Sequence, residues 1–483
     1  MKHGWNTDIL SSVLSRVRPS PGLCLTKGLI MDRRKWLTQI SLAGGAALPL
    51  LAVNQTAQSQ QPATASQTAA KGQGPLKITD VKAILTAPAG IRLVVVKVTT
   101  SEPGLYGLGC ATFTQRARVV ATAVDEYLRP FLIGKDATQI EDIAQSAWLS
   151  SYWRNGPVLN NALSGVDMAL WDILGKRSGV PLYQVLGGKC RKAVDTYRHA
   201  SGSSLEAVEE SVKRYQAEGY RHIRVQVSVP GQSTYGTRAR GAVVDPAERN
   251  NNRIETWDPK PYCRIVPKLF EHLRKKLGDE VELLHDMHER VPPILAMQLV
   301  KDLETYRPFF IEDPFSPEDI GYFEHLRKLT ATPIAMGELF NSRHEWMDLV
   351  SRRLIDFIRV HISQVGGLTP ARKMAAMCEL FAVRTAWHGP GDVSPVGHAA
   401  NVHLDLAVPN FGIQEAREFT PAEQEVFPGC PTLKDGYYWA NDKPGLGIDL
   451  DEKLAAKFPI KDDPPFDFSW GNLRNRDGTV AKP

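Results

Sequence analysis

The chain has 483 residues, which is enough for two or three domains and a large core. Apolar residues make up 43% and charged residues 23%, a balance typical of a globular protein. The formal charge of +5 comes from residues 1–75, which carry four Lys and four Arg against two Asp. The basic balance therefore belongs to the N-terminal segment and does not indicate a nucleic-acid partner.

The N-terminal segment has the pattern of an export signal. A twin-arginine pair begins at Arg33 and is followed by an apolar run at 40–53, then by a polar stretch rich in Ala, Gln, Ser and Thr. The apolar run is too short to span a membrane. We therefore predict that residues 1–75 form a twin-arginine signal and linker, that the protein is exported to a bacterial periplasm, and that it keeps no stable membrane insertion after signal removal. Met31 is an alternative start, which would leave residues 1–30 untranslated.

The cysteines do not suggest a disulfide framework. No two are close in sequence, and five of the six follow the signal, so at least one of these cannot pair within the chain. Buried free thiols are the expectation. The six are Cys24, Cys110, Cys190, Cys263, Cys378 and Cys430.

Residues 76–190 are predicted to form an N-terminal α+β capping domain. The β-branched run at 91–99 is typical of a strand, and three later segments space their apolar residues as a helix does. These helical segments are 116–132, 140–153 and 162–174.

Regular alternation of strand and helix patterns follows, over residues 191–420. This alternation predicts an α/β domain, a (β/α)₈-type TIM barrel, with an insertion at 228–262 and a tail at 421–483 that packs on the cap and completes it. The eight candidate strands are 194–199, 221–227, 281–286, 307–312, 333–338, 355–360, 381–387 and 411–415.

Three acidic residues follow successive candidate strands at equal spacing. Asp286, Glu312 and Glu338 are each 26 residues from the next, and each ends a short apolar run. A strand with its returning helix takes about 25–35 residues, so the spacing places one carboxylate at the C-terminal end of each of three neighbouring strands. Carboxylates without cysteine favour a hard divalent ion, and Mg²⁺ is the expected cofactor.

Several motifs resemble one known family. The segment ALWDILGKRSGVPLYQVLGG at 169–188 is similar to the cap-to-barrel junction of the enolase superfamily, whose members include mandelate racemase and muconate lactonizing enzyme. The motifs LLHDMHERVPP, FFIEDPFSPED, TPIAMGELFNS, HGPGDVSPV and NFGIQE resemble its D-mannonate dehydratase group, which includes starvation-sensing proteins. This resemblance spans about 76–475 and implies that the three carboxylates bind Mg²⁺, which holds the substrate carboxylate and stabilises an enediolate.

The resemblance also implies catalytic residues. Arg224 and Tyr235 match the base pair of the group, in which the guanidinium would favour tyrosinate by lowering the tyrosine pKa. His288 matches the general acid that protonates the departing 3-hydroxyl. A stacking role for Tyr235, and for His288 a role as hydrogen-bond partner of a carboxylate, are the alternatives.

Further positions are implied by the resemblance to contact the substrate: His199, Thr114, Arg359, His388, Asp392 and Glu415. Arg359 suits a carboxylate. For Asp392 and Glu415, structural hydrogen bonding is the alternative. The chain has Thr114 where the group has Asn, and Gly391 where Thr is usual, so proton abstraction is the firmer inference and mannonate the weaker one.

Together these features predict an Mg²⁺-dependent acid-sugar dehydratase, a hydro-lyase that converts D-mannonate or D-gluconate to 2-keto-3-deoxy-D-gluconate. Its partner would be a small sugar acid, and the resemblance implies a homo-oligomer. Two alternatives remain. A racemase or epimerase would use His388 as a second base, although Arg359 and His361 stand where its usual Asp partner would lie. The other is a sugar-acid-binding or starvation-response protein with little or no turnover.

Overall fold

The computed structural model describes residues 75–230, 232, 235, 255–461 and 473–482. The described residues all belong to one compact unit. The twin-arginine pair and the apolar run after it therefore lie outside the described residues. Within the described ranges, no helix combines the length and the apolar character needed to cross a membrane.

The cap begins with a three-stranded antiparallel sheet in the order β1-β2-β3. The strands are β1 (Ile78–Thr86), β2 (Leu93–Thr100) and β3 (Tyr106–Cys110). The first four residues of β2 are all buried, which places β-branched side chains on both faces of the strand. The β-branched run read from the sequence is thus the central strand of the cap sheet.

The cap helices match the predicted segments, except that α3 ends at Leu149 and α4 extends beyond 162–174 at both ends. They are η2 (Thr114–Arg116), α1 (Ala117–Thr122), η3 (Ala123–Leu128), α2 (Arg129–Leu132), α3 (Ile140–Leu149), α4 (Pro157–Ser178) and α5 (Leu182–Val185). From α1 to α2 the chain is continuously helical, and its middle part, η3, is a π-helix. The long helix α4 starts with proline at its first turn and ends at Gly179, whose φ of 68° provides the left-handed cap.

Two glycines let β3 approach α4 closely. A Cβ on Gly107 would lie 2.0 Å from the carbonyl oxygen of Ala169, and one on Gly109 would lie 1.9 Å from that of Gly165. Both atoms belong to the backbone of α4, so neither can move aside as a side chain could. The closeness of the sheet to the helix therefore depends on these glycines.

We predict that Gly109→Ala destabilises the protein by about 2–3 kcal/mol, the upper part of the range for overpacked cores. The shift of the urea unfolding midpoint measures this change. Gly321→Ala is the matched control, because Gly321 has no atom within 4 Å of its Cβ position and a φ of −58°. The control should stay within about 0.5 kcal/mol of the parent protein. Equal shifts for both variants would contradict the close-packing argument.

The second part of the fold is the predicted barrel, and all eight candidate strands are present. They are β4 (Val194–Gly202), β5 (His222–Val227), β7 (Glu282–Asp286), β8 (Phe310–Glu312), β9 (Ile334–Met336), β10 (Phe357–Ile358), β11 (Arg384–Thr385) and β12 (Gln414–Glu415). Parallel pairing runs in this order from β4 to β11. β12 pairs with β4, and a parallel bridge from Thr385 to Phe411 joins the last two strands, so the ring closes. The fold prediction is confirmed.

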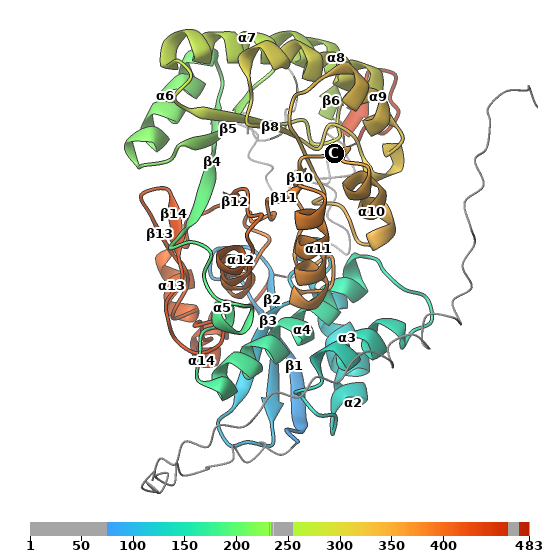
Figure 1. Ribbon diagram of the computed structural model, residues 1–483, viewed down its shortest axis with the longest axis vertical. Coiled ribbons are helices and arrows are strands. Elements are labelled where there is room, and N and C mark those ends of the chain that lie inside the picture. Colours follow the sequence, from blue (N-terminus) through green and yellow to red (C-terminus); the bar gives the residue numbers. More distant parts are fainter. Residues whose placement is uncertain (1–74, 231, 233–234, 236–254, 462–472, 483) are drawn as a thin grey trace, which may run out of the picture. The chain divides into compact units, whose positions relative to one another are not determined.

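Helices surround the strands, and Figure 1 shows α6 to α11 on the outer side of the barrel. The helical elements of this part are α6 (Leu205–Ala217), α7 (Pro259–Leu277), α8 (Pro293–Leu303), η5 (Glu304–Tyr306), η6 (Pro317–Asp319), α9 (Tyr322–Leu329), α10 (Arg343–Ser351), α11 (Leu368–Leu380) and α12 (Pro395–Ala407). Local signals set several of these boundaries. For example, Ser342 and Glu345 form a capping box at the start of α10.

One layer of apolar side chains fills the barrel interior. It consists of Tyr197, Leu284, Phe310, Ala335, Phe357, Ala386 and Ile413, which form a single buried cluster. Side chains two residues apart on a strand point to the same face. Residues two positions later along these strands therefore also point into the barrel, one layer nearer its C-terminal end.

The tail was predicted to pack on the cap, and its first part does so. The carboxylate of Asp172 on α4 accepts hydrogen bonds from the backbone N–H of Leu446 at 2.8 Å and of Leu108 at 3.0 Å. Glu452 lies 2.5 Å from Nζ of Lys82 and 2.7 Å from Nζ of Lys97. The elements of this part are α13 (Pro421–Val426), β13 (Thr432–Lys434), β14 (Tyr437–Trp439) and α14 (Glu452–Ala455). β14 also pairs with β4, so the tail touches both the cap and the barrel.

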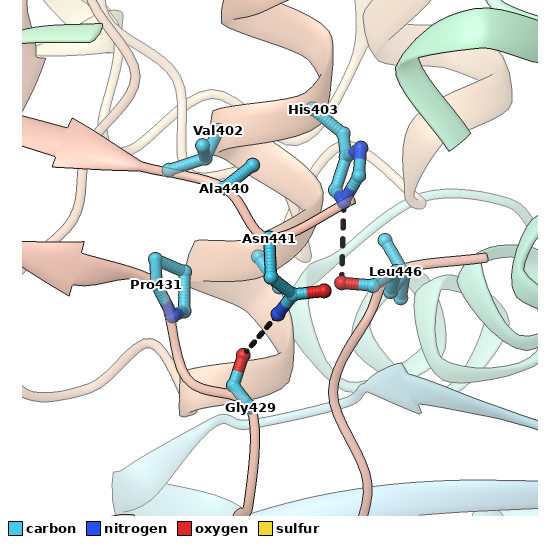
Figure 2. A pocket seen from close by; sticks show the side chains of 8 residues that line it. Val402, His403, Gly429, Pro431, Ala440, Asn441 and Leu446 are labelled. Atoms are coloured by element: carbon cyan, nitrogen blue, oxygen red, sulfur yellow. Dashed lines mark hydrogen bonds between the residues drawn. The ribbon is translucent and has the colours of Figure 1, made fainter. Parts of the chain in front are cut away.

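Figure 2 shows how side-chain hydrogen bonds hold this part of the tail around a small hollow. His403 on α12 accepts from the backbone N–H of Tyr183 at Nδ1, so its Nε2 carries the proton that is donated to Leu446 O at 3.2 Å. Asn441 donates to Gly429 O at 3.0 Å. None of the residues that line this hollow is a predicted site residue.

The last described stretch of the tail requires a correction. Strand β15 (Leu473–Asn475) pairs in parallel with β6 (Glu255–Trp257), which lies within the predicted barrel insertion. Lys482 contacts Ser316 and Asp319 after β8. Residues 473–482 thus pack beside the barrel and not on the cap, because β6 presents strand hydrogen-bonding groups that β15 satisfies.

The cysteine prediction is half right. The five described cysteines are free, as expected, but only Cys110 and Cys378 are buried. Cys190 is exposed, while Cys263 and Cys430 are partly buried.

Candidate active site

Six of the predicted site residues follow residues of the apolar barrel layer by two positions. Asp286 and Glu312 follow Leu284 and Phe310 by two residues, and they are direct neighbours in the register of β7 and β8. His199 and Glu415 follow Tyr197 and Ile413 in the same way on β4 and β12. Arg359 and His388 continue the pattern just past the ends of β10 and β11. The alternation of strand side chains thus places these groups together.

The carboxylates do not meet quite as the spacing predicts. Single oxygens of Asp286, Glu312 and Asp313 lie within 4.8 Å of one another, and all three residues are buried. Glu338 is not part of this closest group. Its strand β9 ends at Met336, and Gly337 adopts a φ of 142°, so Glu338 follows the strand layer by three residues instead of two.

Glu338 nevertheless faces the same centre. His288 Nδ1 lies 3.4 Å from a carboxylate oxygen of Asp286 and 3.4 Å from one of Glu338. Arg359 Nη1 donates to the other oxygen of Glu338. Asp313, which the sequence argument missed, joins the group because a positive φ of 41° turns it back from the strand direction. An acidic residue directly after a strand-end Glu was the available signal.

Two buried arginines bridge the carboxylates. Arg224 Nη1 donates to Asp286 at 3.0 Å and to Glu312 at 2.9 Å. Arg359 Nη2 lies 2.8 Å from Glu312 and donates to Glu415 at 2.6 Å. Such contacts offset part of the cost of burying charge. Arg359 therefore lies among the carboxylates of the site.

The cluster fits a divalent cation because its five carboxylates outnumber its two arginines. Burial raises the pKa of Glu312 well above its usual value, even though Arg359 and Arg224 lower it. Burial raises the pKa of Asp313 in the same way, with Glu338 adding to the effect. The surplus comes from five carboxylates, those of Asp286, Glu312, Asp313, Glu338 and Glu415. An all-oxygen donor set of this kind suits Mg²⁺.

His199 lies between Arg224 and Glu415 at the edge of the cluster. Arg224 Nη2 donates to His199 Nδ1 at 3.0 Å, since a guanidinium cannot accept. The ring proton then lies on Nε2, which is 2.7 Å from Glu415 Oε1. Burial, followed by the charge of Arg224, lowers the pKa of His199, so the neutral ring has a defined tautomer.

Tyr235 and His288 form a stacked pair beside the carboxylates. Their ring centroids are 3.5 Å apart and the planes differ by 11°. His288 has a φ of 51°, and its backbone N–H donates to Asp286 Oδ1 at 2.7 Å. The bend after β7 therefore aims Asp286 and His288 at the same region.

Arg224 acts on the pKa of Tyr235 in the expected direction, but larger influences oppose it. Arg224 lies 5.6 Å from the ring centroid of Tyr235 and lowers its pKa. Burial is the larger influence, and Asp286 and Glu338 add to it, so the pKa of Tyr235 is raised well above its usual value. The guanidinium favours tyrosinate, but by itself it does not offset burial and the carboxylates.

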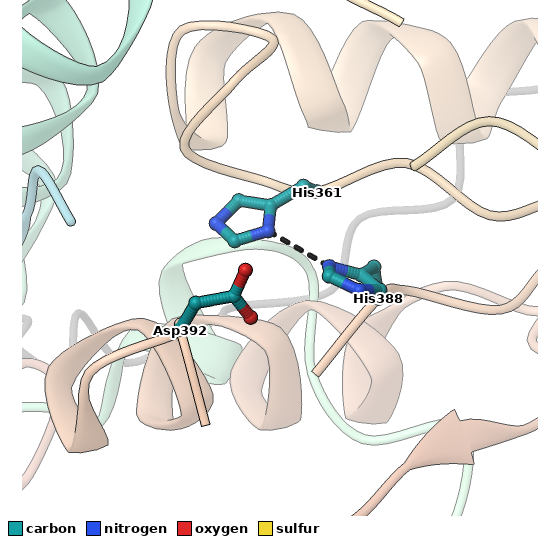
Figure 3. A group of neighbouring side chains, drawn as sticks. All are labelled: His361, His388 and Asp392. Atoms are coloured by element: carbon teal, nitrogen blue, oxygen red, sulfur yellow. Dashed lines mark hydrogen bonds between the residues drawn. The ribbon is translucent and has the colours of Figure 1, made fainter. Parts of the chain in front are cut away.

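On the far side of the cluster, His388 and Asp392 meet a third residue, His361. Figure 3 shows the two rings side by side with the Asp392 carboxylate facing both. His388 Nε2 lies 3.3 Å from Glu338 Oε2. In the sequence argument His361 entered only as a replacement for an expected Asp.

Among the described residues, no contact links Thr114 to the cluster. It lies in η2, where its hydroxyl donates to Gln115 at 2.9 Å. The cap does reach the barrel nearby, because Ser363 Oγ donates to Cys110 O at 3.4 Å. A Cβ on Gly391 would lie 2.7 Å from Cδ1 of Ile91, so the cap leaves little room for a side chain there.

Tyr197 is a further residue that the sequence argument missed. Its hydroxyl accepts from Arg359 Nε at 3.1 Å and donates to Glu312 Oε2 at 3.4 Å. Tyr197 lies two residues before His199, in the apolar layer, and the signal was a polar tip on an otherwise apolar strand position.

The sequence matches two family descriptions that cover most of the described fold. Residues 70–187 match the mandelate racemase/muconate lactonizing enzyme N-terminal domain, and residues 206–454 match the enolase C-terminal domain-like family. A cap of this type followed by a closed parallel barrel with strand-end carboxylates defines the class of the protein. The chain belongs to the mandelate racemase/muconate lactonizing enzyme family of the enolase superfamily.

Individual relatives are similar over almost their whole length. A D-galactonate dehydratase family member from Musicola paradisiaca is 54% identical, covering 84% of this chain and 99% of the relative. One from Salmonella enteritidis is 53% identical with the same coverage. The crystal structure of an enolase from Pantoea ananatis with bound D-gluconate and Mg matches with a TM-score of 0.78 and 52% identity, covering 84% of this chain and all of that one.

Proposed function

We propose that the protein is an Mg²⁺-dependent acid-sugar dehydratase. It would remove the C2 proton and the 3-hydroxyl of D-mannonate or D-gluconate as water, and the resulting enol would become 2-keto-3-deoxy-D-gluconate. The carrying observation is the buried carboxylate cluster with the stacked Tyr235–His288 pair beside it. The relatives named as dehydratase family members and the relative with bound D-gluconate and Mg support the acid-sugar class. Their names do not single out mannonate, and this finer assignment stays a proposal.

The proposed metal ligands are Asp286, Glu312 and Glu338, with Asp313 as an adjoining carboxylate. When bound, Mg²⁺ supplies positive charge that holds the substrate carboxylate, offsets the carboxylates that raise the pKa of Tyr235, and stabilises the charge formed as the α-proton leaves.

The side chains of the chain itself would divide the remaining work. Tyr235 would take the C2 proton, with Arg224 favouring its anion. His288, whose Nδ1 lies 3.4 Å from the Asp286 carboxylate, would donate a proton to the leaving hydroxyl. His199, Arg359, His388, Asp392 and Glu415 would hold the substrate or the groups around it. Export by the twin-arginine route and assembly as a homo-oligomer belong to the proposal as predictions from the sequence.

An elimination assay tests the proposal. The protein from about residue 75 would be incubated with Mg²⁺ and a panel of aldonates that includes D-mannonate, D-gluconate and D-galactonate. Semicarbazide absorbance then detects 2-keto-3-deoxy acids. We expect product from one or two members and none after EDTA treatment. No product from any member, with Mg²⁺ shown to bind, would contradict the dehydratase. Tight aldonate binding in that case would identify a binding protein, and exchange of the C2 proton without elimination would identify a racemase or epimerase.

A further inference from the structure

The hydrogen bond between His361 and His388 constrains where their protons lie. The Nδ1 atoms of the two rings are 2.8 Å apart, as the dashed line in Figure 3 shows. One nitrogen must therefore donate and the other accept. An imidazole with its ordinary pKa of about 6.5 is mostly uncharged near neutral pH, and each ring then carries a single N–H.

The other side of His388 decides the direction of this hydrogen bond. Its Nε2 lies 3.3 Å from Glu338 Oε2 and 4.0 Å from Glu415 Oε2. Ionised carboxylates only accept hydrogen bonds, so the single proton of His388 is favoured on Nε2. Nδ1 of His388 is then the acceptor, and His361 Nδ1 is the donor.

The opposite arrangement carries two penalties. It would direct a lone pair of His388 Nε2 at the carboxylates of Glu338 and Glu415. It would also leave an N–H on His361 Nε2, an atom that is buried and has no hydrogen-bond partner among the described residues. A buried donor without a partner loses its hydration without compensation. The Asp392 carboxylate faces both rings, but no hydrogen bond joins it to either of them among the described residues.

We propose that His361 is a positioning residue that holds His388 as a neutral hydrogen-bond donor, with its proton on Nε2 directed into the active site. In this form His388 can donate to an oxygen of the substrate, but it cannot accept a proton from carbon. An Asp in place of His361 would accept from Nδ1 and leave the Nε2 lone pair free, which is the form that a second base requires. The inference rests on the proposed dehydratase function, and it favours elimination with one base over epimerisation.

Nitrogen chemical shifts test the tautomer directly. Magic-angle-spinning NMR on ¹⁵N-histidine-labelled protein with Mg²⁺ separates protonated from unprotonated ring nitrogens. The His388 signals would be assigned by their loss in His388→Gln. We expect an unprotonated Nδ1 and a protonated Nε2 in His388. A protonated Nδ1 would overturn the proposal. This result does not depend on turnover, so it stays distinguishable from failure of the dehydratase proposal, which an inactive parent protein would reveal.

An isosteric pair of variants tests the catalytic consequence. His361→Asn keeps an N–H that can donate to His388, whereas His361→Asp offers only an acceptor. We expect kcat of the Asn variant to fall by no more than about tenfold, the worth of one neutral hydrogen bond, and that of the Asp variant to fall about tenfold to a hundredfold further. Assays at Mg²⁺ well above the Kd of each variant remove the effect of weakened metal binding. Equal losses, or a smaller loss for the Asp variant, would overturn the proposal.

Discussion

Replacing Glu312 by Gln should abolish detectable Mg²⁺ binding and lower kcat/KM by more than about 100-fold, beyond the effect typical of groups that only support a metal ligand. Glu312 is fully buried between Arg224 and Arg359 and adjoins Asp286 across the strand pair. The substitution removes one negative charge from the centre of the cluster and keeps the shape of the side chain. Isothermal titration with Mg²⁺ and the elimination assay measure the two effects.

The matched control is Glu379→Gln, the same chemical change at an exposed position on α11. It should leave Mg²⁺ binding and turnover as in the parent protein. Because Glu312→Gln leaves two buried arginines with less compensation, a stability loss of about 3–5 kcal/mol is also expected, and thermal unfolding would detect it. A folded Glu312→Gln variant that binds Mg²⁺ within tenfold of the parent protein would contradict the assignment.

Tyr235→Phe should lower kcat by about 100- to 10,000-fold, the range typical of losing a positioned general base. Phenylalanine can keep the ring stacked on His288, so only the hydroxyl is lost. Mg²⁺ and aldonate should bind within about threefold of the parent values, since an uncharged ring remains beside the carboxylates. Single-turnover kinetics with the best aldonate of the panel, together with titration of both ligands, measure the change.

Tyr127→Phe is the control for this prediction, because Tyr127 lies in the cap with 72% of its surface exposed. It should have no effect on kcat. Turnover of Tyr235→Phe within about fivefold of the parent protein would contradict the role of Tyr235 and direct attention to another base. Unchanged kcat together with unchanged aldonate binding would instead support the stacking role that the sequence also allowed, because phenylalanine keeps the stacked ring.

The strand pattern and its spacing were sufficient for the barrel and for the carboxylates of Asp286, Glu312 and Glu338 at its mouth, whereas the family resemblance supplied the other site residues there. Each site residue on β4, β7, β8 and β12 follows an apolar strand residue by two positions, as Glu312 follows Phe310. Strand side chains alternate between two faces, so a short apolar run indicates which way its last residue points. The constant length of the strand–helix unit then brings those ends to one face of the barrel. Both rules are local, and therefore a single sequence can reveal them.

Only the tertiary structure decided how the site groups meet. The positive φ values of Asp313 and Gly337 bring Asp313 into the closest carboxylate group and leave Glu338 outside it. Burial, which depends on the whole fold, raises the pKa of Tyr235 against the influence of Arg224. The contact of His361 with His388 joins residues from neighbouring barrel strands.

Two further outcomes, the place of residues 473–482 and that of Thr114, also depended on the tertiary structure. Residues 473–482 join β6 beside the barrel, although their sequence suggested a continuation of the tail over the cap. Thr114 stays in its own turn, with Gln115 as its partner. Backbone turns, strand-edge pairing and desolvation depend on partners that are distant in sequence. The chain's local pattern therefore determined which chemistry is present, and the packing of the barrel and cap determined which groups act on one another.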